Sequence, residues 1–182
     1  MSGSQVASFR IIGDQRERGI AWAAPRFRQS PGDWDRASCL LLENANNILA
    51  CVLYSHWYPA NSVQMHIAAV DGGKWLNRAF LATAFRVPFL EWNMRRVWAQ
   101  VDSDNAKSIN FCKRLGFVQE GRMRQGTSAE VDTLIFGLLK SECRFIGDDF
   151  GKAVRTSSAK SGHNGASPNG FKSGYCANPN RA

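Results

Sequence analysis

The stretch from Val97 to Arg124 constrains the fold of this chain most, because it carries the signals that begin and end three successive elements. The apolar run at 97–101 contains two valines and a tryptophan, and it predicts a β-strand. Four polar residues at 102–105 then interrupt the run. All four types are good helix N-caps, because a short side chain can accept hydrogen bonds from the free N–H groups of a first helical turn. We therefore predict a helix directly after this strand.

The predicted helix runs from Ala106 to Leu115, with Ile109 and Cys112 spaced for one face. Gly116 follows, and glycine can end a helix in a left-handed conformation without a steric penalty. Phe117 is then expected to open the next strand, so the whole stretch predicts strand, helix and strand.

Other parts of the first 146 residues show similar patterns. Apolar or alternating runs predict further strands at 6–12, 38–43, 48–57, 62–70, 117–120 and 131–139. The turn at 44–47 joins two of these strands as a hairpin. A helix is predicted at 75–93, shortened or kinked by Pro88, whereas 20–28 is ambiguous between irregular structure and a short helix. Hairpin-linked strands followed by helix, strand and helix predict a mixed sheet covered by helices.

Length and charge separate a body from a tail. The 182 residues suit one domain, which we place at 1–149. Residues 150–182 are rich in Gly, Ser and Asn and contain five of the Lys and Arg residues that make the net charge +8. We expect this basic segment to be a flexible tail able to contact anionic partners. The body is not basic enough to indicate a nucleic-acid-binding domain, and no run suits a membrane span or a secretory signal.

The five cysteines show neither paired motifs nor metal-ligand spacing, so we predict free thiols, no metal site and a cytoplasmic location.

The central stretch resembles a known family. Strand, Asn-x-x-Ser, Leu-Gly-Phe and Glu-Gly-x-x-Arg are similar to the second half of a GCN5-related N-acetyltransferase (GNAT) domain. The likeness is to the ribosomal-protein N-terminal acetyltransferases, and more to short acetyltransferase-like proteins of tailed phages. The phage-like pieces cover roughly residues 5–146 and include WLNRAFLATAF from Trp75, Val87-Pro88-Phe89, Asp132 and Glu142-Cys143-Arg144. The resemblance implies an α+β fold: a mixed, mostly antiparallel, twisted sheet of six or seven strands flanked by helices.

The resemblance also implies a site for acetyl-CoA as acetyl donor. Its pyrophosphate would lie in the turn of Gly72, Gly73, Lys74 and Trp75, where glycine N–H groups and a helix N-terminus favour an anion. The chain departs here from the usual family pattern, because Trp75 stands in a crowded stretch. Judged on the turn alone, the same two glycines are better explained as an ordinary turn between strand and helix. Backbone N–H groups of Ile67, Ala68 and Ala69 would polarise the thioester carbonyl.

Asn105 and Ser108 begin the central helix. In similar acetyltransferases the Asn binds the pantetheine arm or bridges the split strands, and the Ser can pass a proton to the leaving thiolate. Many GNAT domains instead use a Tyr, at the position that Cys112 occupies in this chain. Both residues are equally explained as helix caps.

Two further residues are candidates for deprotonating the amine that would accept the acetyl group. His66 titrates near neutral pH and lies on a strand beside the expected site, although a half-buried structural histidine is the more common case. Glu120 lies on a late strand and could bind or deprotonate the amine. Cys112 lacks an adjacent histidine, so core packing explains it better than nucleophilic catalysis.

Taken with the resemblance, these residues imply a cytoplasmic enzyme, in the host cytoplasm if phage-encoded. It would move an acetyl group directly to an amine of a protein N-terminus, a lysine or a small molecule. The expected partner is that amine-bearing acceptor, with the chain a monomer or homodimer and no membrane contact. A GNAT-fold binding module without turnover, contacting protein or nucleic acid, is the alternative.

Overall fold

The computed structural model describes residues 9–45, 47–72, 75–126 and 130–147, so the predicted tail at 150–182 lies outside the described residues. The described chain forms one seven-stranded sheet in the order β1-β2-β3-β4-β5-β7-β6. The strands are β1 (Phe9–Ile12), β2 (Ser38–Asn44), β3 (Asn47–Tyr58), β4 (Ser62–Ala69), β5 (Arg96–Asp102), β6 (Val118–Met123) and β7 (Thr133–Leu139). Neighbouring strands pair antiparallel, except that β4 and β5 pair parallel. The predicted mixed, mostly antiparallel α+β fold is therefore confirmed.

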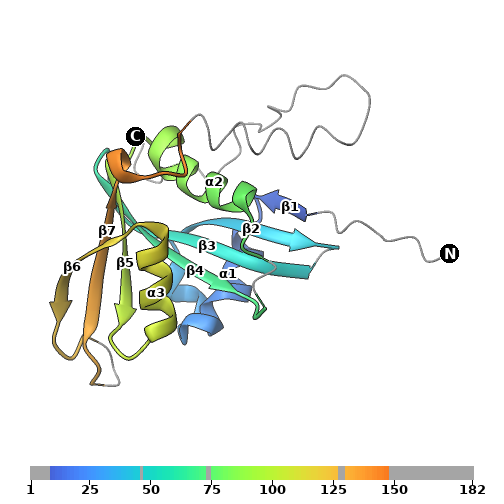
Figure 1. Cartoon of the computed structure of the whole chain (residues 1–182). Coiled ribbons are helices and arrows are strands. Elements are labelled where there is room, and N and C mark those ends of the chain that lie inside the picture. The colour runs from blue at the N-terminus through green and yellow to red at the C-terminus, as the bar shows by residue number, and fades with distance from the viewer. Residues whose placement is uncertain (1–8, 46, 73–74, 127–129, 148–182) are drawn as a thin grey trace.

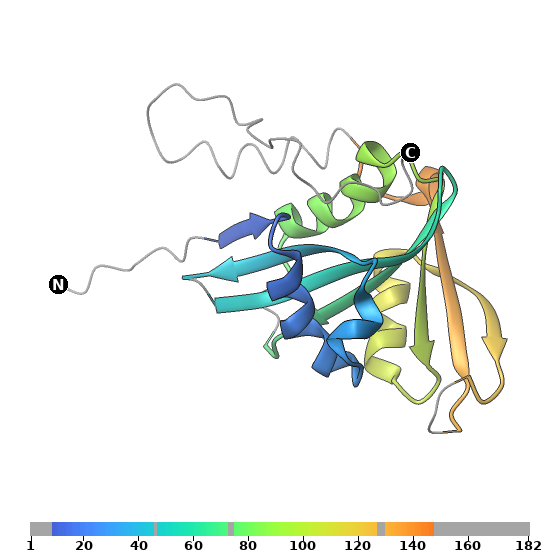
Figure 2. The same ribbon diagram turned by 180° about the vertical axis from the view of Figure 1, so that it is seen from behind.

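Helices cover both faces of this sheet (Figures 1 and 2). On one face lie α2 (Arg78–Arg86), the π-helical turn η3 (Val87–Glu91) and α3 (Ala106–Leu115), and on the other α1 (Arg16–Ala23) with the 3₁₀ turns η1 (Ala24–Phe27) and η2 (Pro31–Trp34). A further 3₁₀ turn, η4 (Lys140–Glu142), follows β7.

Each face has its own apolar core. The larger core lies under α2 and α3 and is built from alternate strand residues such as Val52, Val63 and Val97. The smaller core lies under α1, η1 and η2 and uses the opposite faces of β2 and β3, through residues such as Leu41 and Leu53. We call these the α2/α3 face and the α1 face of the sheet.

The helix predicted from Trp75 begins three residues later, at Arg78. The Asn77 side chain accepts a hydrogen bond from the Phe80 N–H at 2.8 Å, so Asn77 is the N-cap and the residues before it lie outside the helix. Pro88 acts as predicted and ends the regular helix in the turn η3. Proline has no N–H for the Ala84 carbonyl, which instead accepts from the Tyr54 hydroxyl at 2.7 Å.

Two other predicted boundaries were wrong. Helix α1 begins at Arg16, four residues before the segment 20–28 that the sequence left ambiguous between irregular structure and a short helix. Its apolar signal is weak because Gly19, Ile20 and Ala23 are its only buried residues. Phe117 does not open a strand, since its N–H donates to the Cys112 carbonyl at 3.0 Å and so helps to close α3.

Four of the predicted free cysteines lie in the described chain, and all four are buried and unpaired. No described helix has the length and apolar character to cross a bilayer. Within the same residues, no group of three or more His, Cys, Asp or Glu side chains is arranged to hold a metal ion.

Candidate active site

The parallel strands β4 and β5 pair over only part of their length. Their register contains three residue pairs, and the last of these joins Gln64 to Trp98. Beyond that pair the strands diverge toward their carboxyl ends, which is visible as a V in Figure 1. We call the paired segments (62–64 and 96–98) the closed half and the diverging segments (65–69 and 99–102) the open half.

The open half leaves backbone donors of β4 without a neighbouring strand. The Val70 N–H donates to the Leu49 carbonyl, next to β3, at 2.8 Å. Since backbone groups alternate in direction along a strand, the N–H of Ala68 also points toward β3, whereas those of Ile67 and Ala69 point toward β5. Of the three donors predicted for the thioester carbonyl, Ile67 and Ala69 therefore have the required direction and Ala68 does not.

His66 lies at the start of the open half, on the α1 face of the sheet. Its Nε2 is 2.9 Å from the Oγ of Ser55, a buried serine of β3. The Trp34 indole meets the imidazole edge-on with ring centroids 4.7 Å apart, and the Phe27 ring lies 5.8 Å away. His66 is thus held in one orientation by a hydroxyl and two aromatic rings.

This environment keeps the imidazole neutral. Burial, and to a smaller extent the nearby His56, lowers the pKa of His66 from 6.5 to about 3. A neutral imidazole can accept a proton, but one with so low a pKa holds it weakly. Any base role for His66 thus requires that the proton move on to another group.

Helix α3 begins directly beyond the open end of β5, and its N-terminus is capped by a side chain. The Asn105 Oδ1 accepts the Ser108 N–H at 3.0 Å, so the cap uses the side chain of Asn105 and only the backbone of Ser108. This leaves the Ser108 hydroxyl without a part in the cap. Cys112, one turn further, is buried in the core, and burial raises the pKa of its thiol to about 11. The structure thus favours core packing for Cys112, as predicted.

The loop after β4 is held against α3. Asp71 forms an ion pair with Lys107 at 3.3 Å, and the Trp75 ring packs edge-on against Phe111 with centroids 5.5 Å apart. Gly72 has a φ of 97°, a left-handed conformation that favours glycine. Gly73 and Lys74 lie outside the described residues, so the predicted pyrophosphate turn is described only in part.

Glu120 has a partner away from the open half. Its carboxylate lies 2.5 Å from the guanidinium of Arg96, which pairs with Ser62 in the closed half. The carboxylate also covers Gly137 of β7, where an added Cβ would clash with Oε1. This arrangement gives Glu120 a structural role between β5, β6 and β7 and does not bring it to His66.

Asp132, in contrast, holds the connection between β6 and β7. Its carboxylate accepts from the Gln125 N–H at 2.8 Å and from Arg122 Nε at 2.5 Å, and these hydrogen bonds lower its pKa. Asp132 therefore holds the connection between β6 and β7 in place.

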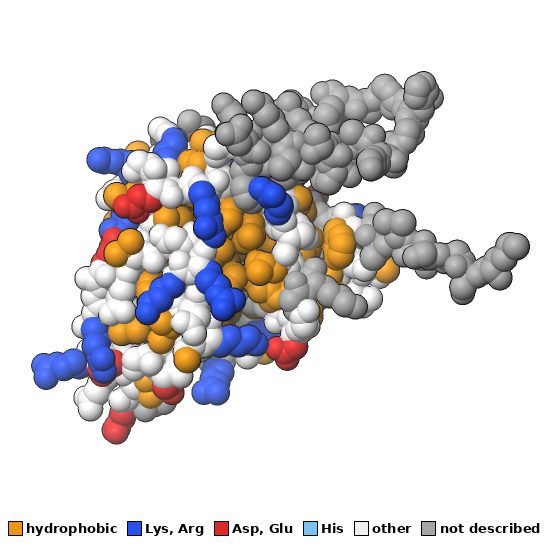
Figure 3. Space-filling model, viewed as in Figure 1, with side chains coloured by type: hydrophobic (Ala, Val, Ile, Leu, Met, Phe, Trp, Pro, Cys, Tyr) orange, Lys and Arg blue, Asp and Glu red, His pale blue; other side chains and the backbone are white. Residues whose placement is uncertain are grey.

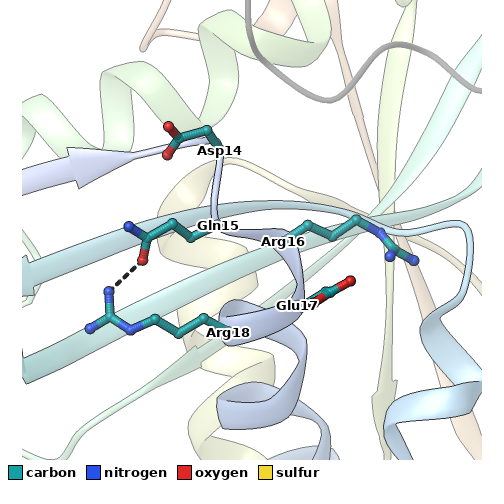
Figure 4. Close-up of a pocket in the computed structure, with 5 residues that line it drawn as sticks. All are labelled: Asp14, Gln15, Arg16, Glu17 and Arg18. Carbon is teal, nitrogen blue, oxygen red and sulfur yellow. Dashed lines mark hydrogen bonds between the residues drawn. The ribbon is translucent and has the colours of Figure 1, made fainter.

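A surface cavity at the start of α1 contains none of the candidate catalytic residues. It is lined by residues 14–18, shown in Figure 4. Arg18 bonds Gln15 and Glu43 at 2.7 Å each, and Arg16 donates to the backbone carbonyl of Ala37. Because both guanidiniums are engaged in linking α1 to its neighbours, we assign this cavity a structural origin.

The α2/α3 face carries an apolar surface surrounded by positive charge. Figure 3 shows hydrophobic side chains gathered between α2 and α3, with Lys and Arg side chains around them. Partly buried apolar residues from the open half, the following loop and α3 pack against the larger core in this part of the molecule, namely Ile67, Ala69, Trp75, Ile109 and Phe111. An apolar surface with basic side chains around it suits a ligand that has an apolar arm and a phosphorylated end.

Comparison with known proteins identifies the fold. No protein-family model and no curated protein matches the sequence. Among solved structures, spermidine/spermine N-acetyltransferase SpeG from Vibrio cholerae aligns with a TM-score of 0.59 and 16% identity, over 73% of this chain and 93% of that one. A mutant form of the same enzyme aligns with a TM-score of 0.60 and 15% identity, over 78% of this chain and 97% of that one. The chain therefore has the GNAT fold, as the resemblance implied.

Sequence reasoning missed the surroundings of His66: Ser55, His56, Trp34 and Phe27. A usable signal was present in the hairpin of β3 and β4. Its short turn at 59–61 fixes the register, and that register pairs Ser55 with Gln64, two positions from His66. The two aromatic residues come from η1 and η2, whose packing no local pattern indicates.

Proposed function

We propose that this protein is an N-acetyltransferase that moves an acetyl group directly from acetyl-CoA to an amine. The divergence of β4 from β5 after Gln64 and Trp98 carries this proposal, because it frees the N–H groups of Ile67 and Ala69 next to His66. A catalyst of acyl transfer needs donors where the carbonyl oxygen becomes negative and a base near the nucleophile. Both requirements are met along one strand.

The residues present fit acetyl-CoA, which would supply its acetyl group as a reactive thioester. Apolar side chains such as Ile67 and Phe111 suit the pantetheine arm, and the Lys and Arg side chains around them suit the phosphates. The N-termini of α2 and α3 both follow the open ends of β4 and β5, where their dipoles favour an anion. The Gly72 turn and Asn105 are the positions we assign to the cofactor there.

Each group of the chain has a distinct task in this mechanism. The N–H groups of Ile67 and Ala69 polarise the acetyl carbonyl, and His66 accepts a proton from the attacking amine. Ser108 donates its hydroxyl proton to the departing sulfur, a role left open by a cap that uses only its backbone N–H. The base and the acid thus come from opposite faces of the sheet.

The acceptor is an amine of a small molecule, a lysine or a protein N-terminus. The structural likeness to SpeG makes a polyamine the first compound to test, followed by peptides with free N-termini. All of these acceptors are protonated at neutral pH, so each requires the base.

Two measurements test the function in sequence. Isothermal titration calorimetry should show one acetyl-CoA site per chain, and release of free CoA thiol should then depend on an amine from a panel of polyamines, peptides and aminated antibiotics. A folded protein without affinity for acetyl-CoA would overturn the proposal. Binding without turnover on any amine would instead support a GNAT-fold binding module.

A further inference from the structure

A chain of hydrogen bonds connects His66 with the surface. The Oγ of Ser55 lies 2.9 Å from His66 Nε2 and also 2.9 Å from Nδ1 of His56. His66 is partly buried, Ser55 is 8% exposed and His56 is exposed, so the three side chains form a continuous path from the open half of β4 to solvent.

A β-bulge makes this path possible. Consecutive residues of a regular strand point to opposite faces, so Ser55 and His56 should not share one. The β3–β4 register shifts by one residue between Ser55 and Tyr58, and His56 has a φ of 48° in the left-handed region. The extra residue turns His56 toward Ser55, and Trp57 returns to the larger core. Bulges that redirect a side chain in this way are frequent beside active sites.

The strained conformation at His56 has no evident packing benefit. The backbone of a non-glycine residue is costly there, and the ring is solvent-exposed apart from an edge-on contact with Trp98 at 6.1 Å. Its two ordered interactions within the described chain are this contact and the hydrogen bond to Ser55. The strand therefore distorts at the position that completes the path.

We propose that His66, Ser55 and His56 form a proton relay that carries the amine proton to solvent, an inference that rests on the proposed acetyl transfer. A protonated amine loses two protons as its nitrogen forms the new C–N bond and the C–S bond breaks. One proton is balanced by the proton that the CoA sulfur receives from Ser108. The relay carries the other proton to solvent.

The transfers balance at named atoms. His66 Nδ1, which has no hydrogen-bond partner among the described residues, accepts the amine proton, and Nε2 gives its own proton to Ser55 Oγ. Ser55 in turn gives its hydroxyl proton to His56 Nδ1, and His56 releases one from Nε2 to water. In the resting state, each of the two imidazoles therefore carries its proton on Nε2. Burial makes a charged His66 unfavourable, so His66 alone holds the amine proton only weakly. Transfer onward to an exposed imidazole means that His66 does not have to remain charged.

The groups that face His66 from the elements packed against it are Ser55 and His56 of β3, Phe27 of η1 and Trp34 of η2. His56 is the one among them whose side chain is exposed to solvent. Loss of the His56 imidazole should therefore lower turnover, because it breaks the path from His66 to solvent.

The kinetic test replaces His56 with Asn, which tolerates a left-handed φ and cannot relay a proton. We expect His56→Asn to lower kcat roughly tenfold at pH 7 with KM unchanged, and added imidazole to restore it, because the missing group was solvent-exposed. Ser55→Ala should show the same loss without rescue, and Ser62→Ala, at a buried serine of the closed half, should show none. A wild-type kcat in His56→Asn, or a loss of kcat that imidazole does not restore, would overturn the relay.

The second test needs no turnover. Nitrogen-15 NMR distinguishes the two neutral tautomers of an imidazole, and the relay requires His66 and His56 to carry their protons on Nε2 at pH 7 in the free protein. A proton on Nδ1 of His66 would overturn the relay even if acetyl transfer is observed. Absence of transfer by the wild-type protein would overturn the proposed function instead, so the two failures are distinguishable.

Discussion

The closed and open halves of the β4–β5 pair differ in pairing and not in residue type. Val63 and Val97 of the closed half are fully buried and lie opposite each other in register. Ile67 and Ala69 of the open half continue the same apolar alternation, yet they remain partly exposed and their N–H groups have no strand beside them. The first half of strand β4 can thus stabilise the sheet while its second half provides the candidate active site.

The largest effect should come from His66. We expect His66→Gln to lower kcat by about 10³-fold, within the range for loss of a positioned base, because glutamine keeps a polar side chain but cannot take up the proton. The closed-half variant Ser62→Ala should keep wild-type turnover. Steady-state kinetics on both purified proteins checks this, and equal activities would mean that the two halves do not differ in function.

The Ser108 hydroxyl should have the next largest effect. Ser108→Ala should lower kcat by roughly 10²-fold while leaving acetyl-CoA affinity unchanged. Its thermal stability should also be retained, because alanine keeps the backbone N–H that Asn105 caps. The matched variant Asn105→Ala should lose on the order of 1 kcal/mol of stability. Full turnover in Ser108→Ala would remove this hydroxyl from the mechanism.

Acid should destabilise the protein through the open half. The pKa of His66 is about 3 in the folded protein and 6.5 in the unfolded chain, so the unfolded chain takes up the proton first as the pH falls. The associated stability is complete above pH 6.5 and is lost progressively toward pH 3. By pH 5 the loss is roughly 2 kcal/mol. Urea unfolding at pH 8 and pH 5 should show this loss in the wild type, with a correspondingly smaller loss in His66→Gln. Identical pH dependence in both would contradict it.

Two proline substitutions in adjacent residues should have opposite consequences. Ala69→Pro removes an N–H that points toward β5, so the protein should fold and bind acetyl-CoA about tenfold more weakly. Ala68→Pro removes an N–H that points toward β3 and should cost roughly 1–3 kcal/mol of stability. Chemical unfolding and calorimetry separate these outcomes, and the reverse pattern would mean that the backbone directions are assigned wrongly.

Local rules predicted most of the fold. The Asn105 cap, the ten residues of α3 and the left-handed Gly116 follow from side-chain and backbone preferences within a few residues. The hairpin of β2 and β3 follows equally from alternation and its turn. The start of α1 was missed, because a short helix with three buried residues has almost no apolar period.

The candidate site was only partly predictable, because long-range packing determines it. His66 and Ser108 were identified by residue type and by the family resemblance; His66 lies in the open half, and Ser108 lies in the first turn of α3, which follows β5. The divergence of β4 from β5, the bulge at His56 and the Trp34 ring over His66 depend on the whole sheet. Glu120 shows the converse case, since its residue type suggested chemistry and its position gives it an ion pair with Arg96.

Amide hydrogen exchange in β4 tests the central claim most directly. In the free protein the amides of Ile67 and Ala69 should exchange much faster than that of Ala68, which lies between them and points toward β3. Saturating acetyl-CoA should slow the exchange of Ile67 and Ala69 and leave Ala68 unchanged, as resolved by NMR at single residues. Equal protection of the three amides in the free protein, or bound acetyl-CoA that leaves Ile67 and Ala69 exchanging as before, would contradict the account.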